Sequence, residues 1–433
     1  MQALLLAFIF DQPNKFYLQK NMIMRLLFLL FSLTGVQFLI AQPIPKVILV
    51  IADGIPADVM ERLQPPAMQQ IIKQGAYKRA YVGGIAGTYK ETPTISAPGY
   101  NDMLTGTWGY KHNVWDNDNQ KPNYNYPSVF RLFKTVKPGG KTAIFSTWTD
   151  NREVLLGAGL PQTNNLKIDY ICDGYEKDTL SFPHDKSGLY MHKIDEYVIH
   201  CADSVVRNYA PDLSWIYLEN TDEVGHRKGT GAPFDSAIFM LDNQIKKIAE
   251  AIQYRETNYN EKWLLIITTD HGRDSIKGHN HGGQTQRERT TWIIINKANT
   301  NAYFADNSPA IVDILPSVAN YLNFSLPETA AKEIDGVPFI GNISVSNARI
   351  ESGGDSLTVY WDSFVPDEQL AVSISYTNNT KNGGTDTYQL LGKAKSSDKQ
   401  FRCTVKDLSK QNFYKVLIEG KYNDANVWHT ASK

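Results

Sequence analysis

The chain has 433 residues, of which 42% are hydrophobic and 21% are charged, a composition typical of soluble globular proteins. This length exceeds one ordinary domain, so we expect one large core and a smaller second unit. The formal net charge is −1, which excludes a general electrostatic attraction to nucleic acid or to anionic membranes.

The N-terminus has the pattern of a secretory signal peptide over residues 1–41. A basic residue, Arg25, precedes an apolar stretch from residue 26 to residue 40, and Ala41 offers a small residue at the cleavage point. The stretch is short for a membrane span. We therefore expect translation to begin at Met22 or Met24, and a periplasmic or secreted mature protein without a transmembrane anchor.

Three cysteines occur in the chain, at positions 172, 201 and 403. An odd number in an exported protein leaves at least one thiol unpaired. The pair that we expect is Cys172 with Cys201.

Strands and helices alternate through residues 42–342. A buried strand is predicted at 46–51, followed by a helix over 56–72 that Pro65 and Pro66 should interrupt. Further strands are predicted at 141–146, 213–218, 263–267 and 290–295, and further helices at 99–104, 195–209, 234–253 and 310–322. Such alternation predicts an α/β domain whose mostly parallel sheet is sandwiched by helices.

The pattern changes in residues 343–433. Short alternating segments at 357–361, 370–376, 388–391, 401–405 and 413–419 are separated by turn residues. This spacing predicts a small all-β sandwich, and the region resembles a fibronectin type III module. No binding motif is present in it, so its partner is not predicted.

Acidic residues and histidines follow the predicted strands where each strand ends. They are Asp53, Asp222 with His226, Asp270 with His271, and His281, with His279 as an alternative to His281. Open α/β sheets bind ligands at the carboxyl ends of their strands. Carboxylates and imidazoles without cysteine are ligands that zinc accepts. The i and i+4 spacing of Asp222 and His226 can place both on one face of a helical turn.

Ser96 is the candidate nucleophile. A serine hydroxyl is a weak nucleophile unless a base or a metal ion assists its ionisation. A metal ion beside it can serve as the Lewis acid, and a second can hold the oxygens of a phosphoryl group. The backbone N–H groups after Ser96 are expected to add dipolar stabilisation if a helix begins there.

Together these motifs resemble the alkaline phosphatase superfamily, and within it the type I phosphodiesterase/nucleotide pyrophosphatase group. The resemblance covers residues 45–342. It is carried by six motifs in order: Asp53-Gly54, Ser96-Ala97-Pro98-Gly99, residues 112–117, Asp222 to His226, Asp270-His271-Gly272 and His281-Gly282-Gly283.

The resemblance implies two zinc ions. Asp222, His226 and His281 correspond to one zinc site, and Asp53, Asp270, His271 and Ser96 to the other. His281 is preferred to His279 because Gly282-Gly283 follows it, as in the family pattern. Asn117 corresponds to an asparagine that holds a phosphate oxygen.

The implied function is hydrolysis of small-molecule phosphate esters, with phosphodiesters or nucleotide pyrophosphates as the first choice. Serine replaces the threonine usual in nucleotide pyrophosphatases. A phosphomonoesterase is an alternative, with Arg152 as the cation for the additional phosphate charge. A sulfatase ranks lower, because Tyr100 and Gly54 replace the arginine and the second aspartate of that group. The alternative outside enzymes is a surface- or carbohydrate-binding protein with a vestigial enzyme domain.

Overall fold

The computed structural model describes residues 42–118, 120–298 and 300–431. The predicted signal peptide, residues 1–41, therefore lies outside the described residues. None of the described helices has both the length and the apolarity needed to cross a membrane.

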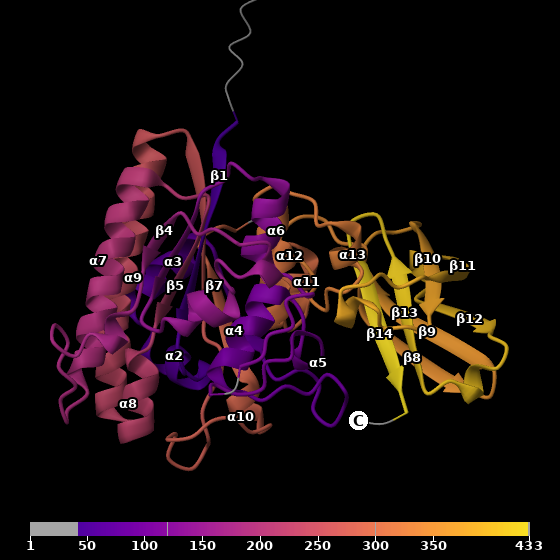
Figure 1. Cartoon of the computed structure of the whole chain (residues 1–433), viewed down its shortest axis with the longest axis horizontal. Coiled ribbons are helices and arrows are strands. Elements are labelled where there is room, and N and C mark those ends of the chain that lie inside the picture. The colour runs from indigo at the N-terminus through magenta and orange to yellow at the C-terminus, as the bar shows by residue number, and fades with distance from the viewer. Residues whose placement is uncertain (1–41, 119, 299, 432–433) are drawn as a thin grey trace, which may run out of the picture. The chain divides into compact units, whose positions relative to one another are not determined.

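A seven-stranded sheet organises the larger part of the chain (Figure 1). Its strand order is β2-β7-β6-β1-β5-β3-β4, and its bounds are β1 Ile44–Ala52, β2 Ala76–Tyr81, β3 Thr142–Ser146, β4 Tyr170–Cys172, β5 Leu213–Leu218, β6 Glu261–Thr268 and β7 Thr290–Ile295. The strands from β6 to β4 are parallel, and β7 runs antiparallel to both β6 and β2. This arrangement confirms the predicted mostly parallel sheet.

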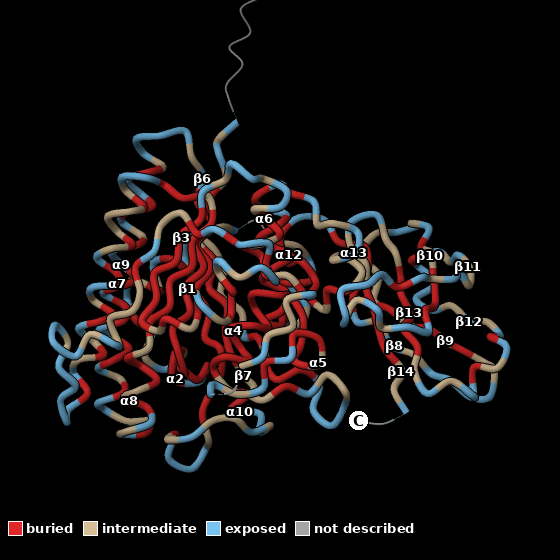
Figure 2. Tube along the Cα trace, in the orientation of Figure 1, coloured by how far each residue is buried: buried red, intermediate tan, exposed pale blue. Residues whose placement is uncertain are grey.

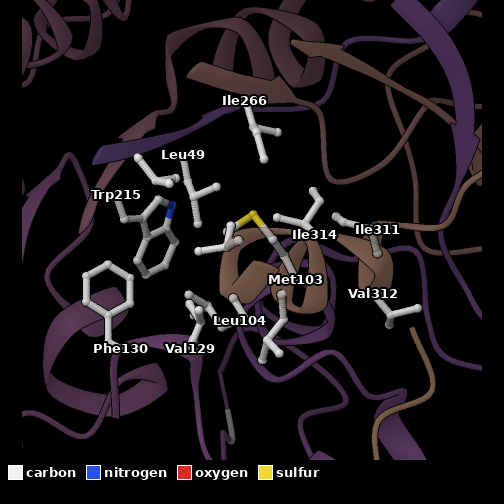
Figure 3. Close-up of a cluster of buried hydrophobic side chains, with 14 of the residues drawn as sticks. Leu49, Met103, Leu104, Val129, Phe130, Trp215, Ile266, Ile311, Val312 and Ile314 are labelled. Carbon is white, nitrogen blue, oxygen red and sulfur yellow. The ribbon is translucent and has the colours of Figure 1, made fainter. Parts of the chain in front are cut away.

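Helices cover both faces of this sheet. Alternate residues of β1 face opposite sides, so that Ile48 and Val50 belong to one buried cluster and Leu49 and Ile51 to the other. The first cluster includes side chains of α2 (Ala57–Leu63), α3 (Pro66–Gln74), α7 (Leu189–Tyr209) and α9 (Ala232–Asn258), and the second those of α4 (Ser96–Thr105), α6 (Val129–Val136) and α12 (Ile314–Tyr321). Figure 3 shows the second cluster, where Leu49 and Trp215 of the sheet lie near Met103 and Ile314.

Shorter helical segments connect these elements. They are α5 (Gly109–His112), η1 (Asn151–Leu155), η2 (Pro161–Thr163), η3 (Tyr175–Lys177), α8 (Asn220–Lys228), α10 (Gln286–Arg289), α11 (Ala302–Asp306), η4 (Ile311–Asp313) and α13 (Glu328–Ala331). The predicted helix at 56–72 is divided by Pro65 and Pro66 into α2 and α3, as expected. The helix predicted at 99–104 begins earlier, at Ser96 itself.

The C-terminal region is an all-β domain, which confirms the predicted fold class. One sheet has the order β11-β10-β13-β14 and the other β12-β9-β8, with bounds β8 Val345–Gly353, β9 Ser356–Ser363, β10 Gln369–Ser375, β11 Gln389–Lys395, β12 Gln400–Thr404, β13 Phe413–Glu419 and β14 Asp424–Thr430; short 3₁₀ turns lie at η5 (Thr380–Asn382), η6 (Ser396–Asp398) and η7 (Leu408–Lys410). Side chains from both sheets, such as Trp361 and Val416, form one buried cluster. In Figure 2 the buried residues of this domain lie mainly in β10, β13 and β14, whereas β11 and β12 are largely exposed or intermediate.

Buried lysines join this β domain to the larger domain. Lys415 Nζ of β13 lies 2.6 Å from Glu333 Oε1, and Lys111 Nζ of α5 donates to Asn426 Oδ1 of β14 at 3.0 Å. Both lysine side chains are fully buried. The boundary at residue 342 stays a prediction, although β8 begins close to it, at Val345.

The expected cysteine pair is wrong for this structure. Cys172, Cys201 and Cys403 all carry free thiols. Cys172 lies at the end of the edge strand β4, where its sulfur is 3.5 Å from the hydroxyl of Tyr175.

Candidate active site

The carboxyl ends of three neighbouring strands carry the predicted acidic residues. Asp53 follows β1, Asp222 lies on α8 just after β5, and Asp270 follows β6. These strands are adjacent and parallel in the order β6-β1-β5. Because parallel strands end at the same edge of a sheet, side chains about 50 to 220 residues apart in the sequence converge there.

Two groups of candidate metal ligands form at this edge. Asp53, Asp270 and His271 make a buried group, whose three side chains have exposed fractions of 1%, 0% and 0%. Asp222, His226 and His281 make an outer group, in which the side chain of His226 is 42% exposed. In each group the candidate ligand atoms lie within 4.8 Å of one another. His279 belongs to neither group, and its Nδ1 atom lies 2.9 Å from the carbonyl oxygen of His226.

Stacked imidazoles connect the two groups. The rings of His271 and His281 are parallel to within 12°, with centroids 3.6 Å apart. His226 Nε2 lies 3.0 Å from His281 Nε2. The two groups are therefore parts of one site.

The histidines are oriented as metal ligands usually are. His271 Nδ1 lies 2.9 Å from the carbonyl oxygen of Gly272, and His281 Nδ1 lies 3.0 Å from that of Thr94. A carbonyl oxygen only accepts, so each Nδ1 carries the proton, and each Nε2 presents a lone pair to the site. Burial is the largest cause that lowers the pKa of both imidazoles, and the charge of Arg273 lowers it further, whereas the charge of Asp222 opposes the shift. Both are thereby kept neutral, the form that binds metal ions.

Each aspartate has one oxygen held by the protein. Asp53 Oδ2 accepts hydrogen bonds from the hydroxyls of Tyr100 and Tyr217. Asp270 Oδ1 accepts the N–H of Gly54 at 3.2 Å, and Asp222 Oδ1 accepts from Arg273.

The remaining oxygens are what a metal ion would need. Among the described residues, nothing donates a hydrogen bond to Asp53 Oδ1 or Asp270 Oδ2, although both are buried. Burial, with the charge of Asp222 next in importance, raises the pKa of Asp53 to about 7. Burial, followed by the charge of Asp53, also raises the pKa of Asp270 well above its usual range. Buried carboxylates without donors are unfavourable unless a cation compensates them, so this donor set fits bound metal ions.

Ser96 lies beside the buried group. It is the first residue of α4, it is 6% exposed, and its Oγ lies 3.3 Å from His271 Nε2. Asn117 reaches the same helix end, where its Oδ1 accepts the N–H of Ala97 at 2.9 Å. The expected series of free N–H donors after Ser96 is wrong: Asn117 takes that of Ala97, Pro98 has none, and Gly99 donates to Ile95.

Arg152 and two tryptophans, Trp108 and Trp115, lie in other surroundings. The guanidinium of Arg152 pairs with Asp173 at 2.7 Å and with Glu153 at 3.0 Å, and it belongs to neither ligand group. Trp108 is buried and stacks on Tyr81, whereas Trp115 is 41% exposed.

Sequence reasoning missed Tyr100, Tyr217 and Arg273 as members of the site. Tyr100 had been noted only as a departure from a sulfatase motif. In the structure the Tyr100 hydroxyl donates a hydrogen bond to Asp53, so this residue supports a candidate ligand. Arg273 directly follows Asp270-His271-Gly272, and this proximity to predicted ligands was the available signal.

The comparisons with known proteins concern mainly the larger domain. The sequence model of the family described as "Type I phosphodiesterase / nucleotide pyrophosphatase" matches residues 47–335, a range that contains every residue of both ligand groups. A 2,3-bisphosphoglycerate-independent phosphoglycerate mutase of Mesoplasma florum is 23% identical over 172 residues, which are 37% of this chain and 31% of the relative. The chain thus matches less than a third of the length of that curated relative.

Two solved structures illustrate the similarity of this chain to known folds. Murine ectonucleotide pyrophosphatase / phosphodiesterase 5 is 14% identical, with a TM-score of 0.47 over 65% of this chain and 96% of that chain. A putative sulfatase from Bacteroides thetaiotaomicron is 13% identical, with a TM-score of 0.48 over 73% of this chain and 83% of that chain.

Proposed function

This chain belongs to the family of type I phosphodiesterases and nucleotide pyrophosphatases, and from that premise we propose that it hydrolyses phosphate esters at a site with two zinc ions. Phosphodiesters or nucleotide pyrophosphates are the proposed substrates. The observation that carries the proposal is the convergence of two ligand groups and Ser96 at one sheet edge, with carboxylate oxygens that lack donors.

The proposed ligands divide as the two groups do. Asp222, His226 and His281 would hold one ion, and Asp53, Asp270, His271 and the Ser96 oxygen would hold the other. Bound zinc would supply Lewis acidity and positive charge for a phosphoryl group. The two ligand groups contain three carboxylates, and the guanidinium of Arg273 compensates one of their charges. Two negative charges then remain, and two zinc ions would add four positive charges, so the loaded site would be positive. The loaded site would therefore attract an anionic substrate.

Ser96 would act as the nucleophile. Its Oγ would lose its proton and attack phosphorus, the bond to the leaving alcohol or phosphate would break as the leaving oxygen takes up a proton, and a phosphoserine ester would form. Water then attacks the same phosphorus, and the Ser96 oxygen leaves with a proton. Each displacement inverts phosphorus, so the whole reaction would retain configuration.

Asn117 would orient the phosphoryl group. Because its Oδ1 accepts the N–H of Ala97, the Nδ2 end of the amide is the end available to donate to a phosphate oxygen. One hydrogen bond to a charged oxygen contributes about 1.5–3 kcal/mol.

The proposal is tested with a diester, a monoester and a sulfate ester of one nitrophenol chromophore, assayed with the zinc-loaded protein. We expect the diester to be hydrolysed fastest, and we expect chelation to abolish the activity and added zinc to restore it. The Ser96→Ala variant is the control for contaminating hydrolases. A zinc-loaded protein that hydrolyses neither phosphate ester, or only the sulfate ester, would contradict the proposal.

A further inference from the structure

Arg273 is a fully buried cation beneath the outer ligand group. Its side chain has an exposed fraction of 0%. Nε donates to the carbonyl oxygen of Gly54 at 3.0 Å, and Nη1 donates to those of Gly278 and His279 at 3.2 Å each. Nη2 donates to both the carbonyl oxygen and Oδ1 of Asp222. A guanidinium can serve so many acceptors in fixed directions, whereas a lysine ammonium cannot.

These acceptors lie on the segments that carry the outer ligands. Asp222 and His226 are one turn apart on α8. Gly278 and His279 belong to the loop that leads to His281, and Gly54 immediately follows Asp53 of the buried group. The loop is also closed internally by Asp274, which accepts backbone N–H groups from residues 276, 277, 278 and 280. Arg273 thus fixes a preformed loop against α8.

The contact with Arg273 also selects one oxygen of Asp222. Oδ1 is occupied by Nη2, while Oδ2 lies 3.1 Å from His226 Nε2. Asp53 and Asp270 show the same division, but their held oxygens accept from neutral hydroxyl or amide groups. Asp222 alone is held by a full positive charge.

The glycines around the guanidinium show how closely it is enclosed. A Cβ atom added at Gly225, between Asp222 and His226 on α8, would overlap the Arg273 guanidinium. A Cβ atom at Gly54 would lie 3.0 Å from Nη2, and Gly54 also has a φ of +67°, which side chains rarely adopt. The chain therefore leaves space for this arginine with small residues on two segments.

We propose that Arg273 is a positioning residue for the outer ion of the proposed two-zinc site. It fixes Asp222 so that Oδ2 alone faces the ion, and it holds the loop that brings His281 to the same point. It also cancels the charge of the only carboxylate in that group, so the outer ion should bind more weakly than the buried one. This inference rests on the proposed function, since it requires that the two groups bind metal ions.

Three variants of the full chain test the role of Arg273. Arg273→Lys keeps the charge but loses the directed N–H groups. Gly225→Ala keeps the arginine and suits a helix, but displaces the guanidinium. Arg255→Lys is the matched control, because Arg255 is also a buried arginine that pairs with a carboxylate, that of Glu261 at 2.5 Å, and Glu261 begins β6, at the opposite end of the strand from the site.

The measurement is the number of bound zinc ions and their affinities, by competition with a chelating indicator. We expect wild type and Arg255→Lys to bind two ions, the second more weakly. We expect Arg273→Lys and Gly225→Ala to keep the first ion and to bind the second at least about tenfold more weakly, as removal of a residue that orients a ligand usually does. Thermal unfolding of each zinc-free variant separates lost stability from lost affinity.

The role of Arg273 and the proposed function would be contradicted by different outcomes. If Gly225→Ala and Arg273→Lys bind the second ion with wild-type affinity, the inference on Arg273 is wrong. If Arg273→Lys does not fold, Gly225→Ala decides alone. If wild type binds no zinc, the proposed function itself fails.

Discussion

The two ligand groups of the site are built from similar residues but in different surroundings. The buried group has two carboxylates, an imidazole and the nearby Ser96, and its acidic side chains are almost fully enclosed. The outer group has one carboxylate with two imidazoles, and His226 is 42% exposed. Arg273 pairs with the outer carboxylate, whereas hydroxyl and amide groups hold the inner ones.

This difference shows how one sheet edge could bind the two proposed ions unequally. Charge and burial favour a tightly held ion at the inner group, since an uncompensated carboxylate in a buried place is unfavourable. At the outer group, the exposure of His226 and the positive charge of Arg273 favour an ion that exchanges more readily. We expect the inner group to prepare the nucleophile and the outer group to receive the substrate.

The largest loss of activity is expected from removing Ser96, the proposed nucleophile, whose Oγ lies beside His271 of the buried group. Ser96→Ala should lower kcat by at least about a thousandfold, because loss of a nucleophile is among the most damaging changes in an enzyme. It should still bind two zinc ions, since the other ligands remain. Ser96→Thr should keep much of the activity, as threonine is the usual residue in the family that the chain resembles.

A chiral thiophosphate diester checks the same step independently. Net retention at phosphorus is expected from two displacements. Net inversion would mean that water attacks directly and that Ser96 is only a ligand or part of the helix end.

Variants with a substituted ligand in one group or the other should differ in how far excess zinc restores their activity. Asp270→Ala and His226→Ala should each lower kcat/KM by at least about a hundredfold, because a metal ion contributes several kcal/mol to such a reaction. High zinc should partly restore His226→Ala, whose site keeps two ligands and access to solvent. Zinc titrations of activity in parallel make this comparison, and equal recovery of Asp270→Ala would show that the inner group is not the tighter one.

Removal of zinc from wild type should occur in two phases. The outer ion should leave first, because His226 is exposed and Arg273 opposes the binding of a cation. A stopped-flow record of zinc release to a chelating indicator would show one equivalent in each phase. A single phase with two equivalents would indicate that the two groups do not differ in this way.

Removing the hydrogen bond that the Tyr100 hydroxyl donates to Asp53 should have a moderate effect on activity. Tyr100→Phe removes one of two donors to Asp53 Oδ2 and leaves Tyr217 at 2.7 Å. A hydrogen bond to a charged group contributes about 1.5–3 kcal/mol, so we expect kcat/KM to fall by about tenfold or more. The matched control is Tyr303→Phe, whose hydroxyl donates to Asp313, which lies in neither ligand group. Equal activity of the two variants would contradict a role for Tyr100 at the site.

The smallest effect on activity is expected at Asp313, a buried carboxyl that lies in neither ligand group. It accepts from Tyr303 and from the N–H groups of Ala310 and Val337, and burial raises its pKa to about 7. A carboxyl whose pKa is higher in the folded than in the unfolded chain stabilises the fold below about pH 4, and this contribution is lost as pH rises through about 7. Asp313→Asn should therefore flatten the decline of Tm between pH 4 and pH 8 while kcat stays unchanged.

That measurement needs the zinc-free protein, so that metal binding does not add its own pH dependence. An unchanged slope of Tm against pH in Asp313→Asn would mean that Asp313 is ionised in the folded protein.

The sequence by itself determined the main sheet, the C-terminal β domain and the ligand types. Buried strands such as β1, β5 and β6 have continuous apolar stretches, and Asp53 and Asp270 follow them directly. Four edge strands were missed, β2, β4, β8 and β14. Of these, β2 and β8 have polar sequences with mixed exposure, because a strand with one partner need not be apolar on both faces. The helix α6 was also missed, although Ser128 caps it and its apolar residues have helical spacing.

Only the tertiary structure decided how these residues share the site. The antiparallel direction of β7, the tyrosine hydroxyls on Asp53 and the contacts of Arg273 each join segments that a local pattern cannot pair. Arg273 and Gly54 are 219 residues apart in the sequence. Periodicity reports which side of a strand or helix is buried, whereas the choice of partner depends on the packing of the whole chain. For that reason the sequence could predict the candidate ligands, while the aspartate oxygens that lack hydrogen-bond donors became visible only in the fold.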